Sequence, residues 1–374
     1  MKKIFKTMFT FLKTLPLMDK RKTKRILIYR LGSLGDTIVT FPAFHLIARA
    51  FPEAERHVLT NFPIGDKAAP LSAILDGSGL VHGYMSYPLG LRDLGQLNSL
   101  RNRIKQSNPD ILIYLAEPRG RAKAIRDVLF FRSCGIKKMI GVPNTRRLQE
   151  NQWLANRQCF EHEAERLARC LTSLGDVRLD DPESWDLHLT VRERERAMRA
   201  VRSFEPYFRF VACSIGTKID VNNWGEENWR NFIGQLYRKH KDYGLVLIGS
   251  KDEFDYSERT SRSWLGPKLN LCGMLTPRES AAVLKIATMF LGHDSGPMHL
   301  AASVGTPCVA IFSARNKPGV WFPYGAGHKV IYHKTGCFGC GLDICKDNEK
   351  RCITSIEVKE VMEAVDKILH HVNS

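Results

Sequence analysis

Residues 25–36 read RILIYRLGSLGD, an apolar run that leads into a turn with two glycines and an acid. The run predicts a buried strand over residues 25–30, a turn over residues 31–36 and a helix from about residue 37 to 49. Strand, turn and helix in this order are typical of a parallel sheet covered by helices. This stretch therefore places the protein in the α/β class.

The same alternation continues along the chain in two series. A length of 374 residues is comfortable for two domains, and the composition shifts over residues 179–202. Two doubly wound halves imply a cleft at the carboxyl ends of their sheets. We expect further strands at residues 58–61, 110–115, 138–142, 208–214, 245–249, 288–291 and 307–312, a hairpin-sized stretch at 269–273, and helices at 120–132, 227–239, 277–287, 297–304 and 355–371.

The chain is strongly basic, with 56 Lys and Arg against 39 Asp and Glu and a net charge of +17. Such an excess predicts an anionic partner, which could be nucleic acid, a membrane surface or a phosphorylated substrate. No recognised nucleic-acid module accompanies the charge, so nucleic acid is not the expected partner.

Residues 1–24 carry much of this excess. Apolar residues recur at helical spacing, lysines fall on the other side, and the chain lacks the roughly 20 apolar residues that a membrane span needs. The pattern predicts an interfacial helix on an anionic leaflet. A frayed, merely basic terminus is the alternative.

Asp36 follows the first glycine turn, at the start of the next helix. A carboxylate there would repel a diphosphate, and it is better placed to act as a general base on an attacking hydroxyl. The alternative is that Asp36 only caps its helix. The interpretation of this turn as a dinucleotide-binding site has less support, because Gly32 and Gly35 do not complete the G-x-G-x-x-G motif.

A second polar loop, GHDSGPMHLAA at residues 292–302, follows a predicted strand and opens a helix. Ser295 and Gly296 would offer backbone N–H groups to a phosphate. Asp294 and His299 could hydrogen-bond to sugar hydroxyls or to the diphosphate. The alternative is a plain helix cap followed by a packed histidine.

A third loop, SIGTK at residues 214–218, again follows a strand. Lys218 at the carboxyl end of a sheet is suited to clamp a diphosphate, and Asn222 could assist by hydrogen bonding. A solvated lysine in a loop is the alternative.

Four cysteines cluster near the C-terminus, while the other six are scattered and indicate a reduced compartment. The cluster could hold a structural zinc or an iron–sulfur group, although its spacing is not that of a zinc ribbon. Unligated thiols are the alternative. Its members are Cys337, Cys340, Cys345 and Cys352.

Together these loops resemble the hallmark stretches of glycosyltransferase family 9, the ADP-heptose:lipopolysaccharide heptosyltransferases and their relatives. The similarity runs from about residue 25 to the C-terminus. It is carried by RLGSLGDTIVTFPAFHLIARAFPEA, DILIYLAEPRGRAKAIRDVLFFRSCGIKKMIGVPN, GTKIDVNNWGEENWRNFIGQL and GHDSGPMHLAASVGTPCVAIF.

The resemblance implies a GT-B fold, in which two Rossmann-like domains face each other across a cleft. Beyond the basic segment at 1–24, it implies an acceptor-side domain at 25–188 and a nucleotide-sugar-binding domain at 189–374, which includes the Cys-rich segment at 337–352. It also implies an inverting, metal-independent transfer that needs no cofactor.

Carried over by position, Asp36 matches the family's catalytic base. Glu253 resembles the residue that holds the donor ribose, and Asn222 stands where the family commonly has a lysine, a charge that Lys218 could supply. The residues that match the donor-binding loop are Asp294, Ser295, Gly296 and His299.

The region that faces an acidic lipid A type acceptor in the family is basic here as well, although a solvated helix face is the usual fate of such runs. Its expected acceptor contacts are Gly35, Arg119, Arg121 and Lys123, with Arg126 nearby. The family's default donor is ADP-heptose. The protein is expected to work at the cytoplasmic face of the inner membrane. Another nucleotide sugar, another acceptor or a non-catalytic binding protein are the alternatives.

Overall fold

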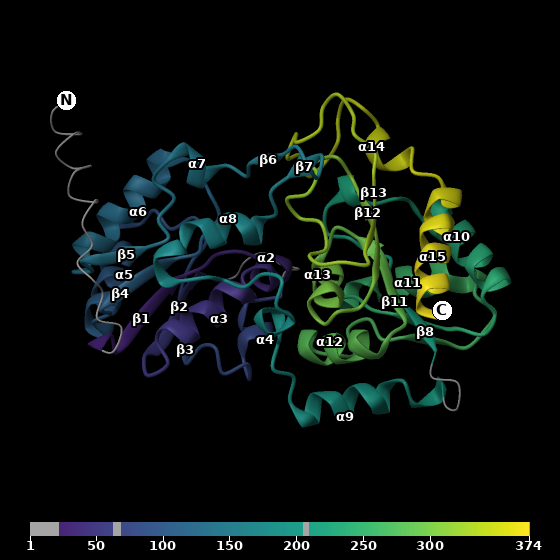
Figure 1. Ribbon diagram of the computed structural model, residues 1–374, viewed down its shortest axis with the longest axis horizontal. Helices are drawn as coiled ribbons and strands as arrows, with labels where there is room; N and C mark the ends of the chain where they lie inside the picture. The colour runs from purple at the N-terminus through teal and green to yellow at the C-terminus, as the bar shows by residue number, and fades with distance from the viewer. Residues whose placement is uncertain (1–21, 63–68, 205–208, 374) are drawn as a thin grey trace.

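The computed structural model describes residues 22–62, 69–204 and 209–373, which form two domains that lie side by side (Figure 1). The N-terminal sheet has the strand order β3-β2-β1-β4-β5, and the C-terminal sheet has the order β10-β9-β8-β11-β12-β13. All pairs in both sheets are parallel. In each sheet the chain starts at an inner strand and winds outward both ways, which is the Rossmann-like arrangement.

The strand bounds agree with most of the sequence predictions. The N-terminal sheet contains β1 (Arg25–Tyr29), β2 (Glu55–Asn61), β3 (Gly83–Tyr87), β4 (Ile111–Tyr114) and β5 (Lys138–Ile140). The C-terminal sheet contains β8 (Phe210–Ser214), β9 (Gly244–Leu247), β10 (Lys268–Asn270), β11 (Met289–His293), β12 (Cys308–Phe312) and β13 (Lys329–Tyr332). A small antiparallel pair joins β6 (Trp153–Leu154) to β7 (Cys159–Phe160).

Helices cover both faces of each sheet. In the N-terminal domain and the connection that follows they are α2 (Leu34–Val39), α3 (Phe41–Ala50), α4 (Ser72–Leu75), α5 (Leu94–Ser107), α6 (Arg121–Ser133), α7 (Arg146–Gln149), α8 (Glu163–Cys170) and α9 (Val191–Ala200). In the C-terminal domain they are α10 (Glu226–Lys239), α11 (Phe254–Thr260), α12 (Pro277–Ile286), α13 (Gly296–Ser303), α14 (Arg351–Thr354) and α15 (Val358–Asn373).

Strand β1 shows why the opening stretch specifies a doubly covered sheet. Ile26 and Ile28 face one hydrophobic core, whereas Leu27 and Tyr29 face another. Alternate side chains of a strand point to opposite faces, so an uninterrupted apolar run is buried only where helices cover both.

Two sequence predictions are wrong in detail. The expected hairpin at 269–273 is the parallel edge strand β10, which pairs with β9. The expected single helix at 37–49 is two helices that meet at Thr40, because Pro42 cannot continue the helix hydrogen bonds and instead starts α3. Helix α2 begins at Leu34, so Asp36 lies in its first turn.

The domains contact each other through side chains near the middle of the molecule. Helix α2 packs beside α13, and α9 lies against α12 at the lower edge of the C-terminal domain (Figure 1). Arg278 of α12 reaches the N-terminal domain, where its Nη1 donates to the carbonyl of Ile74 at 3.0 Å, and it pairs with Glu193 of α9. A buried guanidinium with these partners fixes the relative placement of the domains.

Residues 1–21, with most of the expected interfacial helix, lie outside the described part of the chain. Within that part, no helix is both long enough and apolar enough to cross a bilayer.

Candidate active site between the domains

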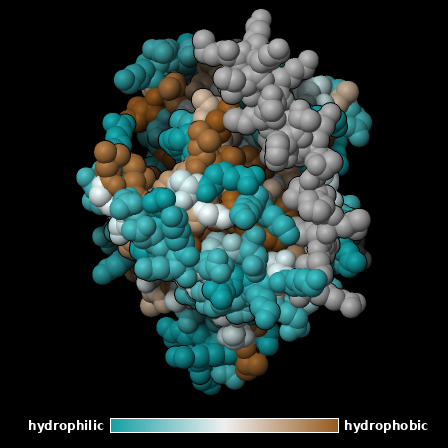
Figure 2. Space-filling view, turned by 90° about the vertical axis from the view of Figure 1, so that its left-hand side faces the viewer, coloured by the Kyte–Doolittle hydropathy of each residue, from teal (hydrophilic) through white to brown (hydrophobic). Residues whose placement is uncertain are grey.

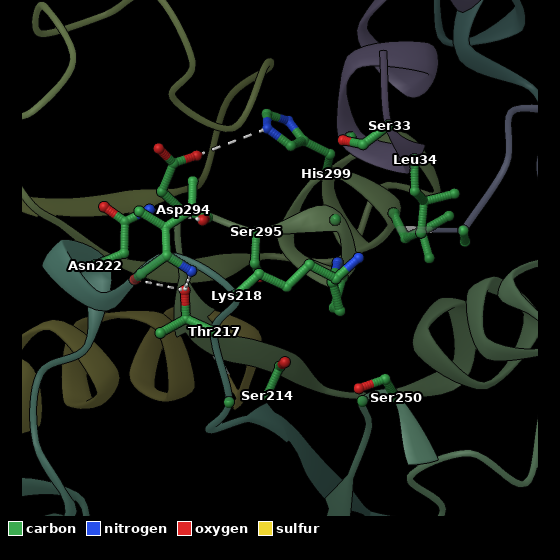
Figure 3. Close-up of a pocket in the computed structure, with 18 of the residues that line it drawn as sticks. Ser33, Leu34, Ser214, Thr217, Lys218, Asn222, Ser250, Asp294, Ser295 and His299 are labelled. Carbon is green, nitrogen blue, oxygen red and sulfur yellow. Dashed lines mark hydrogen bonds and ion pairs between the residues drawn. The ribbon is translucent and has the colours of Figure 1, made fainter. Parts of the chain in front are cut away.

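A cavity of about 530 Å³, the interdomain pocket, lies where the two domains meet. Residues 33–36 at the start of α2 line one side, and Lys218, Glu253 and residues 294–297 line the other. Figure 3 shows Ser33 and Leu34 facing His299 and Ser295 across it. The three loops singled out in the sequence therefore meet at one place, because each follows the carboxyl end of a parallel strand.

The turn after β1 fixes the carboxylate of Asp36. Its Oδ2 accepts hydrogen bonds from the backbone N–H and the hydroxyl of Ser33, the latter at 2.8 Å. Gly32 has a φ of +116°, and a Cβ there would stand 2.8 Å from Oδ2 of Asp36. The capping role considered for Asp36 is thus real, but it uses one oxygen and leaves the second for other contacts.

The loop before α13 brings polar groups to the opposite side. Ser295 is the N-cap of this helix, and its buried hydroxyl has no hydrogen-bond partner among the described residues. The N-terminus of a helix offers free N–H groups and a partial positive charge. This wall of the pocket is therefore suited to an anion such as a phosphate.

Asp294 and His299 belong to the same wall, with Oδ1 and Nε2 4.0 Å apart (Figure 3). Burial raises the pKa of Asp294 to about 7, although a hydrogen bond from Asn316 at 3.1 Å opposes the shift. Burial lowers the pKa of His299 to about 3, so its ring is neutral at physiological pH. His299 can hydrogen-bond to a ligand as a neutral ring, and Asp294, which titrates near pH 7, can accept a hydrogen bond or donate one when it is protonated.

Lys218 points into the pocket from the loop after β8 (Figure 3). Desolvation by the pocket walls lowers the pKa of its ammonium group, and the charge of Glu253 opposes this shift. The carboxylate of Glu253 accepts a hydrogen bond from the N–H of Ser250 at 2.6 Å. Lys218 and Arg315 both line the interdomain pocket, and the expected role of Lys218 as a diphosphate clamp stays a prediction.

Asn222 does not replace the lysine that it substitutes in the family pattern. It is 1% exposed, its amide donates to the carbonyl of Asp294 at 3.3 Å, and its oxygen accepts from Ser313 at 2.5 Å. The side chain therefore holds the backbone of the donor-side loop, although it also borders the pocket.

A second cavity of about 790 Å³, the N-terminal cavity, opens beside Asp36 within the first domain. Tyr29, Arg119 and Lys123 are among its lining residues. Arg119 is fixed by Asp127 at 2.6 Å and by the hydroxyl of Tyr29 at 3.0 Å. The cavity combines aromatic walls with cationic groups, which suits an anionic saccharide.

The other expected acceptor contacts are placed differently. Arg121 is exposed at the start of α6 and lines neither cavity. Gly35 is buried against His299 and borders the interdomain pocket, not the N-terminal cavity. Arg126, which pairs with Asp127, does line the N-terminal cavity. The outer face of this domain is largely hydrophilic, with apolar groups gathered above its middle (Figure 2).

Three of the lining residues that the sequence analysis did not single out carry charged or amide side chains. Glu117 follows β4, and Arg315 and Asn316 follow β12, so all three occupy the strand-end position that marked the other loops. That position was the available signal. It was missed because neither LAEPRG nor FSARN contains a glycine pair, and the resemblance of the first stretch pointed only to the arginines and the lysine that follow Glu117.

The cysteine cluster lies in the segment after β13, and none of its four members lines either cavity. Cys337 and Cys340 are exposed, whereas Cys352 is buried. In the described part of the chain no three His, Cys, Asp or Glu side chains are grouped so that they could hold a metal ion. A structural zinc at this cluster stays a prediction.

Fold and site together define the GT-B class of glycosyltransferase, with two Rossmann-like domains and the pocket between them. The family model described as glycosyltransferase family 9 (heptosyltransferase) matches residues 99–348. The chain belongs to this family.

Individual relatives are distant. Lipopolysaccharide heptosyltransferase 3 of Escherichia coli is 27% identical over 150 residues, which cover 39% of this chain and 43% of the relative. Lipopolysaccharide heptosyltransferase 1 of Pseudomonas aeruginosa is 24% identical over 86% of this chain and 87% of its own. The chain thus aligns with less than half of the Escherichia coli relative.

Solved structures agree in fold. A family 9 glycosyl transferase from Veillonella parvula superposes with a TM-score of 0.71 at 18% identity, covering 95% of this chain and 98% of its own. ADP-heptose LPS heptosyltransferase II of Escherichia coli gives 0.65 at 16% identity, covering 94% and 100%. Escherichia coli heptosyltransferase WaaC, solved with ADP, gives 0.60 at 16% identity, covering 92% and 99%.

Proposed function

We propose that this protein transfers a sugar from a nucleotide diphosphate to a hydroxyl of an anionic glycolipid, with inversion at the anomeric carbon. The C-terminal domain holds the donor, the N-terminal domain holds the acceptor, and Asp36 is the base. One observation carries the proposal: Asp36 borders both the interdomain pocket and the N-terminal cavity.

The chemistry follows from that position. Asp36 takes the proton of the acceptor hydroxyl as its oxygen bonds to the anomeric carbon and the bond from that carbon to the diphosphate oxygen breaks. The leaving diphosphate gains negative charge. Lys218 and the N–H groups at the start of α13 are placed to stabilise this charge, without requiring a metal ion. Glu253, near the loop of Lys218, is assigned to the donor ribose.

The donor we assign is ADP-heptose and the acceptor a lipopolysaccharide-core glycolipid. Support comes from the family, from the Escherichia coli and Pseudomonas aeruginosa relatives, and from WaaC, which was solved with ADP. The cations of the N-terminal cavity suit an acidic saccharide. The basic segment 1–24 would then hold the enzyme at the anionic cytoplasmic face of the inner membrane.

A mixed pool of nucleotide sugars, incubated with the protein and lipopolysaccharide-core acceptors, tests the proposal by mass spectrometry. We expect one donor to be consumed and one sugar mass to be added to the acceptor, without added metal. Asp36→Ala should abolish transfer and retain donor binding by calorimetry. Binding without transfer across the whole panel would instead favour a non-catalytic nucleotide-sugar-binding protein, and transfer retained by Asp36→Ala would remove the base.

A further inference from the structure

The interdomain pocket and the N-terminal cavity share three lining residues: Ser33, Asp36 and Glu117. Ser33 is the N-cap of α2, and its N–H and hydroxyl both donate hydrogen bonds to the carboxylate of Asp36. Glu117 is thus the second carboxyl group at the point where donor and acceptor would meet. The two carboxyl groups act on each other, because the charge of Asp36 and a side-chain interaction with it both raise the pKa of Glu117.

A buried cation holds the two carboxyl-bearing segments together from below. Arg30 is 0% exposed, and its Nη1 donates to the carbonyl of Leu115, two residues before Glu117, at 2.8 Å. Its Nη2 donates to the backbone carbonyl of Asp36 at 2.5 Å. One rigid guanidinium therefore fixes the backbone on both sides of the pair, so their proximity is built into the fold.

Two carboxylates this close, partly removed from water, do not both ionise readily. Burial raises the pKa of Glu117 to about 7, the charge of Asp36 adds to the shift, and Arg30 opposes it. Glu163 of α8 adds a weaker repulsion, although it is paired with Arg166 at 2.6 Å. On the side of Asp36 the facing ring is the neutral His299.

We propose that Glu117 carries the proton shared by this pair and donates it in a hydrogen bond to the carboxylate of Asp36. Glu117 is a positioning residue, because it acts through the base and does not take the acceptor proton. Its hydrogen bond and that of Ser33 hold the Asp36 carboxylate in one orientation. During transfer the acceptor proton moves to Asp36, and Glu117 retains its own.

This inference rests on the proposed function, and its kinetic test is the pH profile of kcat/KM, which reports groups of the free enzyme. Below pH 7 Glu117 is the acid and can donate; as the pH rises through 7 it ionises and repels Asp36. The wild type should therefore lose activity above about pH 7. Glu117→Gln, whose amide still donates but does not titrate, should lack that fall.

Glu117→Leu keeps the size of the side chain but removes the donor, so its kcat should fall about 10- to 100-fold, with KM for the donor changed less than threefold. Glu117→Gln should recover most of this loss at pH 8. A wild-type rate that instead rises through pH 7, with the rise lost in Glu117→Gln, would overturn the proposal, because the doubly ionised pair would then be the active form. Equal profiles in both proteins would overturn it as well.

A readout without turnover separates this inference from the proposed function. Infrared difference spectra between pH 6 and pH 8 should show the loss of protonated carboxyl bands from Glu117 and from Asp294. The band of Glu117 should be absent in Glu117→Gln and present in the control Glu53→Gln, an exposed position, whereas the band of Asp294 should remain in both variants. If no donor is turned over but the Glu117 band is lost between pH 6 and pH 8 as expected, the proposed transferase function is wrong and the proton on Glu117 is supported. If transfer occurs without the band at Glu117, the shared proton is wrong and the transferase stands.

Discussion

Gly35, in the first turn of α2, lies directly against His299 of the opposite domain: a Cβ on Gly35 would stand 2.9 Å from Cδ2 of the histidine ring. The next closest atom would be the Cα of Gly296, at 3.6 Å. The domains thus touch at the two loops that carry the expected base and the expected phosphate-binding helix end. The spacing across the interdomain pocket depends on the missing side chain of Gly35.

We predict that Gly35→Ala lowers kcat/KM for transfer about 100-fold, because a methyl group there must push His299 or the whole of α13 away from Asp36. Displacements on the order of 1 Å between reacting groups have effects of this size. Gly336→Ala is the matched control, since nothing lies within 4 Å of a Cβ there. Steady-state kinetics of both variants checks the prediction, and an unimpaired Gly35→Ala would show that the domains need not touch during turnover.

The two roles of Asp36, helix cap and base, can be separated by two substitutions. Asparagine keeps an oxygen that can accept from Ser33, whereas alanine removes it. Asp36→Asn should therefore retain the free energy of unfolding, and Asp36→Ala should lose about 1 kcal/mol of it. Both should lose transfer by about 100- to 10,000-fold.

Urea unfolding and single-turnover rates on the same preparations measure both effects. If Asp36→Asn lost stability but kept its rate, the side chain would be a cap alone, which was the alternative open from the sequence.

Much of the fold could be predicted from the sequence because its central strands are uninterrupted apolar runs. RILIY and DILIYL are such runs, and their strands are buried on both faces. The edge strands β3 and β13 were missed because GYMSY and KVIY are only partly buried and have no continuous apolar character. The break at Thr40 depends on where Pro42 falls relative to a helix start, which periodicity alone does not locate.

The site was predictable where a loop carries glycines or a lysine after a strand, and not where it depends on contacts across the fold. Arg30 was assigned to a strand, and nothing in the sequence says that its guanidinium ties Asp36 to Leu115. Asn222 looked like a donor contact, but its amide is used by Asp294 and Ser313. Such roles are set by tertiary neighbours, which no local pattern encodes.

Lys218 should contribute to donor binding through the diphosphate. Lys218→Ala should weaken the affinity for the nucleoside diphosphate about 10- to 100-fold, the range expected for a lost hydrogen bond to a charged group. The control is Lys241→Ala, an exposed lysine in the turn before β9. Calorimetry at two salt concentrations checks the result, because screening should weaken wild-type binding more than binding by Lys218→Ala. Equal affinities for wild type and Lys218→Ala would show that Lys218 is a solvated loop lysine with no part in donor binding.

The buried carboxyl group of Asp294 is expected to lower the free energy of unfolding at neutral pH. Burial keeps its pKa at about 7, well above the ordinary value of 3.8. The unfolded chain therefore ionises this group more readily than the folded protein does. As the pH rises from about 4 to 7 the free energy of unfolding falls by this contribution, and above pH 7 the loss is complete. Asp294→Asn should remove the loss, while its amide oxygen still accepts from Asn316.

We therefore predict that Asp294→Asn raises the free energy of unfolding by about 1–3 kcal/mol at pH 8 and leaves it nearly unchanged at pH 4. The same substitution should weaken donor binding, because a group retained in spite of a stability cost is expected to serve the ligand. Urea unfolding at both pH values, with the exposed Asp242→Asn as control, measures the first effect, and calorimetry measures the second. A gain in stability that is the same at pH 4 and pH 8 would show that packing, not the charge of Asp294, limits the stability of this loop.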